Sequence, residues 1–99
     1  MRVISRKALV TFWTRPDCRD AEQPLRAWFK EAEDATWSTP ADVKAKYASA
    51  SVLKNSRVVF NIGGNKYRLV VKINYATKIV FVRLVGTHAE YDRIHAEDI

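Results

Sequence analysis

The chain has 99 residues, of which 47% are hydrophobic and 11% aromatic, a content that suits a folded domain and excludes an intrinsically disordered chain. Its 17 basic and 11 acidic residues give a formal net charge of +6, which favours polyanionic partners. Cys18 is the only cysteine, which excludes an intramolecular disulfide, and no apolar run approaches the length of a membrane span. We therefore expect a single domain over residues 1–99 that is cytoplasmic and not associated with a membrane.

Helical periodicity dominates the first part of the chain. A short apolar strand over residues 1–4 is followed by Ser5 at an N-cap position, and Pro16 ends the helix that begins there. A second helix starts near Asp20 and carries Pro24 in or near its first turn, where proline is tolerated. Its core-facing stripe is apolar: Leu25, Trp28, Phe29 and Ala32.

A third, short helix is predicted from its start signals. Thr39 at the N-cap, Pro40 at the first position and Asp42 at the third are typical of a helix beginning, and we expect it to run to about Tyr47. Residues 48–55 are small and polar, which indicates a loop.

Strand alternation replaces helical periodicity after this loop. Residues 57–62 and 67–73 alternate on either side of the turn Gly63-Gly64-Asn65, which predicts a hairpin, and residues 78–85 complete a meander. Helices grouped before strands indicate an α+β fold, in which the N-terminal helices pack on one face of a mainly antiparallel sheet. We expect the other face to be free to carry function.

Charge is distributed unevenly along the sequence. Residues 54–89 contain no acid and seven bases: Lys54, Arg57, Lys66, Arg68, Lys72, Lys78 and Arg83. A stretch of one sign builds a field that attracts nucleic acid. The alternative is that these are solubilising charges on an exposed sheet face, although ordinary surfaces intersperse both signs.

Five segments, in order along the chain, resemble the HigB family of toxins from type II toxin–antitoxin modules, a branch of the RelE-like ribonucleases. They are SRKAL (residues 5–9), DAEQPLRAW (20–28), RVVFNI (57–62), NKYRLV (65–70) and GTHAEYD (86–92). The resemblance covers nearly the whole chain without a large insertion. It implies a RelE-like fold over residues 1–99, with a short helical tail at the C-terminus.

The resemblance also implies an activity and partners. Members of this family are cytoplasmic endoribonucleases that cleave mRNA, typically on translating ribosomes, and no metal or organic cofactor is expected. A cognate antitoxin encoded by the adjacent gene, commonly a helix-turn-helix protein, silences the toxin. Operator DNA is then bound only through the antitoxin complex.

Metal-free RNA cleavage needs a base for the 2′-hydroxyl, an acid for the leaving oxygen and cations for the anionic phosphorane. Arg68 is the first candidate for the cation, because its planar guanidinium suits phosphate and its place resembles that of the central-strand arginine of RelE-like toxins. Lys66 is a candidate for a phosphate contact or a proton. The alternatives are an exposed strand arginine and a solvated turn lysine.

His88 is the candidate for proton transfer, because histidine exchanges protons near neutral pH. Tyr91 lies three residues on, so a helical turn would place it on the same side, where it would stack on a base or supply a hydroxyl. The alternatives are a structural histidine that ends the strand and an aromatic residue that covers the sheet edge. The scattered positions of Cys18, His88 and His95 do not have the spacing of a zinc site.

The remaining polar residues of the basic strands are expected to bind the RNA backbone: Lys54, Arg57, Asn61, Lys72 and Arg83. Two other functions use the same strands. One is a non-catalytic RNA- or DNA-binding module, and the other is a regulatory module whose basic face binds an acidic protein.

Overall fold

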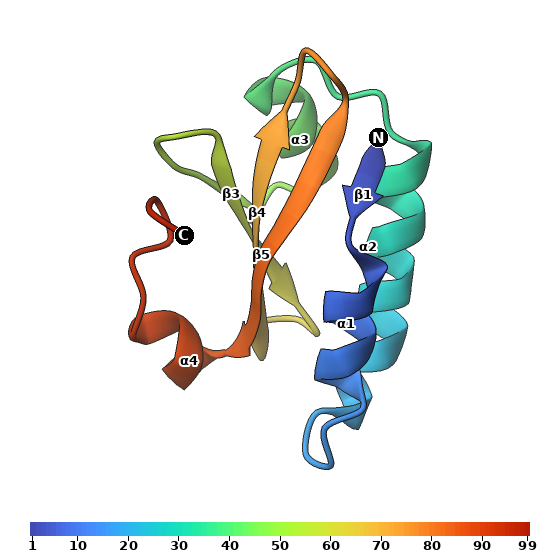
Figure 1. Ribbon diagram of the computed structural model, residues 1–99, viewed down its shortest axis with the longest axis vertical. Helices are drawn as coiled ribbons and strands as arrows, with labels where there is room; N and C mark the ends of the chain where they lie inside the picture. The colour runs from blue at the N-terminus through green and yellow to red at the C-terminus, as the bar shows by residue number, and fades with distance from the viewer.

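The computed structural model describes residues 1–99 and places helices on a five-stranded sheet (Figure 1). The helices are α1 (Arg6–Trp13), α2 (Glu22–Asp34), α3 (Pro40–Lys46) and α4 (His88–Asp92), with a 3₁₀ turn, η1 (Arg19–Ala21), before α2. The strands are β1 (Arg2–Ile4), β2 (Ser51–Val52), β3 (Arg57–Ile62), β4 (Tyr67–Asn74) and β5 (Ile79–Thr87). The predicted α+β class is confirmed.

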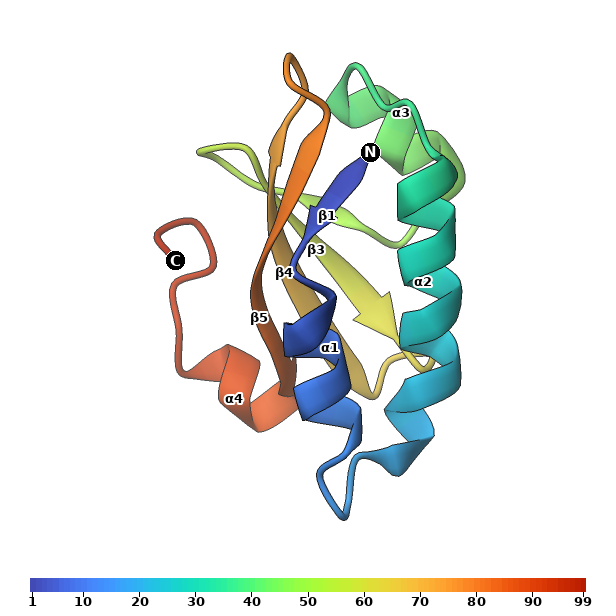
Figure 2. The ribbon, with the colours of Figure 1, turned by 45° about the vertical axis from the view of Figure 1, so that its right-hand side comes forward.

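The strands lie in the order β1-β5-β4-β3-β2. β1 runs parallel to β5, and all other neighbours are antiparallel, so the sheet is mainly antiparallel as predicted. Figure 2 shows the layers: α2 and α3 cover one side of the sheet, whereas α4 and the C-terminal segment lie on the other.

The helix-covered face forms the main core. Its strand residues follow the predicted alternation, with Phe60 of β3 and Leu69 of β4 buried against α2, where Trp28 packs edge-on to Phe60 with ring centroids 5.4 Å apart. Burying one such large apolar side chain contributes about 1.5–3 kcal/mol. This packing fixes which face of β3 and β4 remains for other contacts.

The second face is only partly free, which corrects the prediction of an open face. The apolar side chains Val59 and Val70 stand at its centre, and both are buried beneath Ala96 of the C-terminal segment, residues 93–99. Ile94 and Ile99 are half-buried in the same cluster. Two apolar residues in the middle of a sheet face need cover from water, and the segment supplies it.

Local predictions are mostly confirmed. Thr39 accepts a hydrogen bond from the Asp42 amide (3.3 Å), completing a capping box. Gly63 and Gly64 have positive φ, which glycine adopts without a steric penalty. The predicted loop over residues 48–55 contains β2, whose two residues pair with β3 and are too few to produce a readable alternation.

None of the four helices is long and apolar enough to cross a lipid bilayer.

Candidate functional site

Strand register divides the second sheet face into three rows across β3, β4 and β5. The first row is Asn61–Arg68–Gly86, the middle row is Val59–Val70–Leu84, and the third row is Arg57–Lys72–Phe81. The middle row is apolar and is partly covered by the C-terminal segment. The basic face expected as one site is therefore two polar patches, about 13 Å apart along β4 at ~3.3 Å per residue.

Arg68 occupies the centre of the first row. Its guanidinium donates to the main-chain oxygen of Asn65 (3.2 Å) and to the Asn65 side-chain oxygen (2.8 Å), which orient it. No carboxylate pairs with it. Gly86 lies opposite Arg68 and has no side chain that could cover the guanidinium. The charge of this half-buried arginine is therefore available to an anion.

α4 brings two further candidate catalytic residues, His88 and Tyr91, to the same end of the sheet. The Arg68 guanidinium carbon lies 6.0 Å from the ring centroid of Tyr91, near the outer limit of a cation–π contact. His88 is the first residue of α4 and is exposed, and its imidazole makes no hydrogen bond within the protein. The structure thus brings Arg68 and Tyr91 together, with His88 one helical turn from Tyr91.

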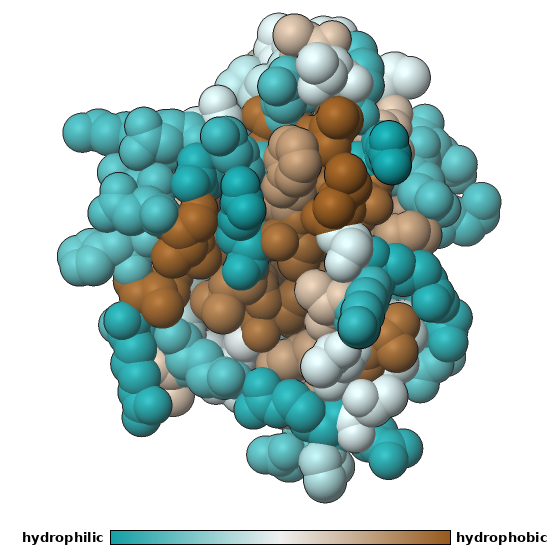
Figure 3. Space-filling view, viewed as in Figure 1, coloured by the Kyte–Doolittle hydropathy of each residue, from teal (hydrophilic) through white to brown (hydrophobic).

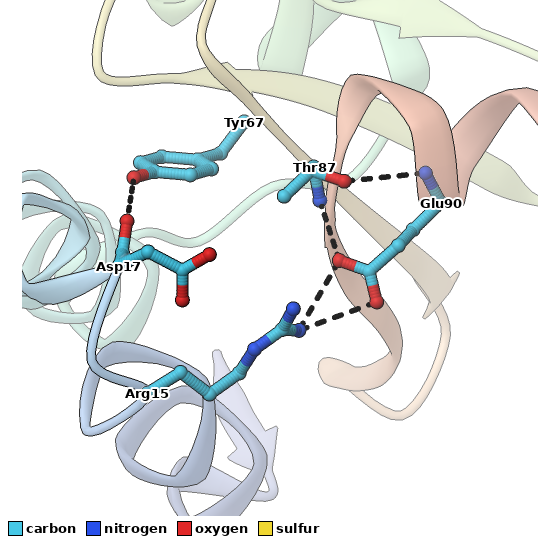
Figure 4. A network of polar contacts seen from close by, with 5 residues as sticks. All are labelled: Arg15, Asp17, Tyr67, Thr87 and Glu90. Atoms are coloured by element: carbon cyan, nitrogen blue, oxygen red, sulfur yellow. Dashed lines mark hydrogen bonds and ion pairs between the residues drawn. The ribbon is translucent and has the colours of Figure 1, made fainter.

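Polar contacts help to fix the position of α4, which buries none of its residues fully and packs on the sheet through the half-buried Tyr91. Thr87 caps it by accepting from the Glu90 amide (3.2 Å), and the Glu90 carboxylate accepts from the Thr87 amide (3.0 Å). Arg15 then donates to both Glu90 oxygens, at 3.1 and 3.2 Å (Figure 4). These bonds from the Thr87 amide and from Arg15 hold the pKa of Glu90 below its usual range.

The Arg15–Glu90 pair positions α4 and adds little to the stability of the fold. Its side chains are 40% and 38% exposed, and a pair so exposed contributes little to stability. Gly86 belongs to the same arrangement, since a Cβ there would lie 3.1 Å from the Cβ of Glu90. We call Arg15, Gly86, Thr87 and Glu90 the α4 clamp.

Lys66 is not free in the way the sequence suggested. Its ammonium pairs with the carboxylate of Asp20, which also accepts from the Tyr67 hydroxyl. The pair lowers the pKa of Asp20 and raises that of Lys66. In this structure the ammonium ties the hairpin to η1.

The third row is also partly engaged. Arg57 donates to the main-chain oxygens of Ile99 (2.8 Å) and Asn55 (2.7 Å), so the C-terminal segment occupies it. The ammonium of Lys72, directly opposite, has no hydrogen-bond partner in the protein. Arg83 is exposed at the β-bulge of β5, with its guanidinium 5.6 Å from the Phe81 ring.

Lys54 lies in the exposed turn before β3, next to the third row, where its main-chain oxygen accepts a hydrogen bond from the Arg57 amide (3.3 Å). No group of three or more His, Cys, Asp or Glu side chains is placed to hold a metal ion.

Sequence reasoning missed the residues that position the site. The spacing Thr87-x-x-Glu90 is a capping-box signature and could have marked the start of α4. Nothing local in the sequence marks Arg15 or Ala96, because their partners are distant along the chain.

Comparison with known proteins agrees with this architecture. Residues 21–94 match the family model HigB_toxin, described as the RelE-like toxic component of a toxin–antitoxin system. The chain therefore belongs to the HigB toxin family, as its sequence motifs predicted.

Individual relatives give the same family. The mRNA interferase HigB of Escherichia coli O6:H1 (strain CFT073) is 29% identical over 72 residues, covering 71% of this chain and 70% of the relative. The mRNA interferase toxin HigB of Escherichia coli K12 and the mRNA interferase HigB of Shigella flexneri are each 36% identical over 55 residues. Those two alignments cover 54% of this chain and about half, 53%, of each relative.

Proposed function

We propose that this protein is a toxin that cleaves mRNA without a metal ion. The observation that carries the proposal is at the first row, where the guanidinium of Arg68, which has no carboxylate partner, lies beside Tyr91, and the exposed His88 begins the helix that carries Tyr91. Family membership supports the toxic role, and the relatives named mRNA interferases support RNA as the substrate.

The proposed chemistry is transfer of the phosphoryl group to the neighbouring ribose oxygen. His88 accepts the 2′-hydroxyl proton as the 2′-oxygen attacks phosphorus, the bond from phosphorus to the 5′-oxygen breaks, and that oxygen takes up a proton. Arg68 stabilises the extra negative charge of the phosphorane. Tyr91 stacks on a base or donates its hydroxyl hydrogen to the 5′-oxygen.

The remaining polar residues bind the RNA backbone in this proposal. Lys72 and Arg83 are free to contact phosphates, and Asn61 extends the first row next to Arg68. Lys54, in the turn next to Arg57, contributes its charge to the third row. Arg57 contacts the RNA backbone only when its hydrogen bond to the main-chain oxygen of Ile99 is broken.

We further propose the biological setting implied by the family. A single domain over residues 1–99 acts in the cytoplasm on messages that ribosomes are translating. A cognate antitoxin from the adjacent gene, commonly a helix-turn-helix protein, neutralises the domain and carries it to operator DNA.

The test is controlled expression followed by primer extension on translated messages. We expect growth arrest and discrete cuts with the wild-type chain, and loss of both with His88→Ala. His95→Ala is the matched control, because His95 is exposed and lies in the C-terminal segment. A folded His88→Ala variant with full toxicity would show that His88 is not the proton carrier.

A non-catalytic RNA-binding module is the second candidate. The third row favours it, because Lys72 and Arg83 flank the half-exposed ring of Phe81, and aromatic rings beside cations suit single-stranded RNA. RNA binding without cuts, on free RNA and on ribosomes alike, would select this function.

A further inference from the structure

β5 has an unpaired edge. β1 pairs with it only as far as Ile4 opposite Phe81, so residues 82–87 have no strand neighbour on that side. An open strand edge presents amide and carbonyl groups that can pair with an added strand. β-Augmentation by an extended peptide is a common recognition mode of this kind.

A groove of about 480 Å³ follows this edge, between β5 and α1. Its strand side is formed by four consecutive residues, 82–85. Leu84 packs with the cluster on the second face and Val85 packs against the main core, so a groove lined by both residues runs along the edge and not over one face. On the α1 side, the small residues Ser5, Ala8 and Thr11 leave room for an incoming chain.

The lining is both apolar and basic. Val82, Leu84 and Val85 supply the apolar part of its strand side. The space-filling view shows apolar surface gathered in the middle of the molecule's visible face, with hydrophilic surface on either side (Figure 3). The charged residues in the lining are Lys7, Arg15 and Arg83, and no acid is among them.

Lys7 and Arg83 have no carboxylate partner within the protein, whereas Arg15 is shared with Glu90. The groove therefore has unsatisfied positive charge beside an unpaired backbone edge. Both features complement an extended peptide that carries carboxylates and apolar side chains.

We propose that this groove binds an extended, acidic and apolar segment of the antitoxin as an added strand beside β5. The inference rests on the proposed function only for the identity of the partner. RNA fits the groove less well, because Phe12, the one aromatic residue in the lining, is 4% exposed and offers no stacking surface.

The test uses two groove variants and two controls, each co-expressed with the product of the reading frame next to the gene. Thr11→Trp fills the groove, and Lys7→Glu reverses one of its free charges. Ala27→Trp and Lys30→Glu make the same changes at exposed positions of α2. None of these positions belongs to the proposed RNA site.

We expect both groove variants to remain toxic when expressed alone and to escape neutralisation, with the neighbouring protein bound roughly tenfold or more weakly. The controls should be neutralised like the wild type. Full neutralisation of both groove variants would overturn the proposal. Loss of toxicity in the folded variants expressed alone would also overturn it, since the groove would then belong to the RNA site.

Hydrogen exchange of the wild-type complex tests the added strand directly. Amides within residues 82–87 that face the open edge should exchange more slowly when the neighbouring protein is bound. Binding without this protection would overturn the added strand. If the wild-type chain is not toxic, yet its residues 82–87 exchange more slowly on binding, the proposed nuclease activity is wrong. The groove would then still be a protein-binding surface.

Discussion

Arg68 shows how the planar geometry of one guanidinium can matter as much as its charge. Asn65 holds one side of the guanidinium, and no acid neutralises it. A fork with several fixed donors can meet two phosphate oxygens at once, whereas a lysine ammonium is a point charge.

Arg68→Lys should therefore lower the cleavage rate by roughly 100-fold while RNA binding weakens only a few-fold. Single-turnover cleavage of a labelled RNA separates the two effects. Arg93→Lys, at an exposed position after α4, is the control. Equal losses in binding and rate would mean that Arg68 binds the substrate without stabilising the transition state.

At the scale of elements, α4 is a short helix that buries none of its residues fully and packs on the sheet only through Tyr91. Its capping box and the Arg15 pair fix it to the end of β5, and Gly86 allows the close approach. Such an attachment can be disturbed without unfolding the domain.

Gly86→Ala should push α4 outward, because the new Cβ would meet the Glu90 Cβ at 3.1 Å. We expect cleavage to fall about tenfold, a change that a 1 Å displacement of catalytic groups readily produces, with a small fall in Tm. Gly64→Ala is the contrasting variant: its site is open but has φ +71°, so stability should fall while cleavage persists. Unchanged cleavage by Gly86→Ala would exclude the α4 clamp as a positioning device.

The C-terminal segment is the second such element: Ala96 packs on Val59 and Val70, and Arg57 donates to the main-chain oxygen of Ile99. Ala96→Asp would place a carboxylate on this apolar surface and should reduce the free energy of unfolding by about 1–3 kcal/mol. Urea unfolding measures the loss, with Asp98→Ala, at an exposed position, as control. An Ala96→Asp protein as stable as the wild type would show that the segment does not cover Val59 and Val70.

At the scale of the whole molecule, the response to acid follows from three carboxylates whose pKa is lowered. Lys66 lowers the pKa of Asp20, the Ser38 amide lowers that of Asp42, and the Thr87 amide lowers that of Glu90. In each case the folded protein binds fewer protons than the unfolded chain, whose Asp and Glu titrate at roughly 3.9 and 4.3.

The stability from these carboxylates is therefore fully present above about pH 5 and is lost as the pH falls through the folded pKa values. Urea unfolding between pH 7 and pH 3 should show this decline. Asp42→Asn should flatten it, whereas Asp98→Asn should leave its slope unchanged, since Asp98 makes no ion pair in the protein. Stability that rises on acidification would contradict the assignment.

Net positive charge should also govern RNA affinity. The logarithm of the RNA-binding constant falls linearly with the logarithm of the salt concentration. For single-stranded RNA, each protein cation that neutralises a phosphate makes this slope steeper by about 0.7. We expect Lys72→Ala to reduce that slope by about this amount and Lys30→Ala, on α2, to leave it unchanged. Filter binding over a series of salt concentrations measures both, and an unchanged slope for Lys72→Ala would remove the third row from the RNA path.

Local sequence determined the elements of this protein. The apolar stripe of α2, the capping box of α3 and the alternation of β3 and β4 each arise from neighbours within a few residues, so periodicity and cap chemistry could predict them. The same alternation placed Arg68 and Lys72 on one face, and the family motifs marked His88 and Tyr91.

Tertiary structure alone decided which of those residues are free to act. Asp20 engages Lys66, Ile99 engages Arg57, and Ala96 covers the row between the two polar patches. Arg15 holds α4 through a partner 75 residues away. Such contacts depend on how the layers pack. Packing brings together side chains that are far apart in the sequence at no regular spacing, so sequence periodicity could not predict these contacts.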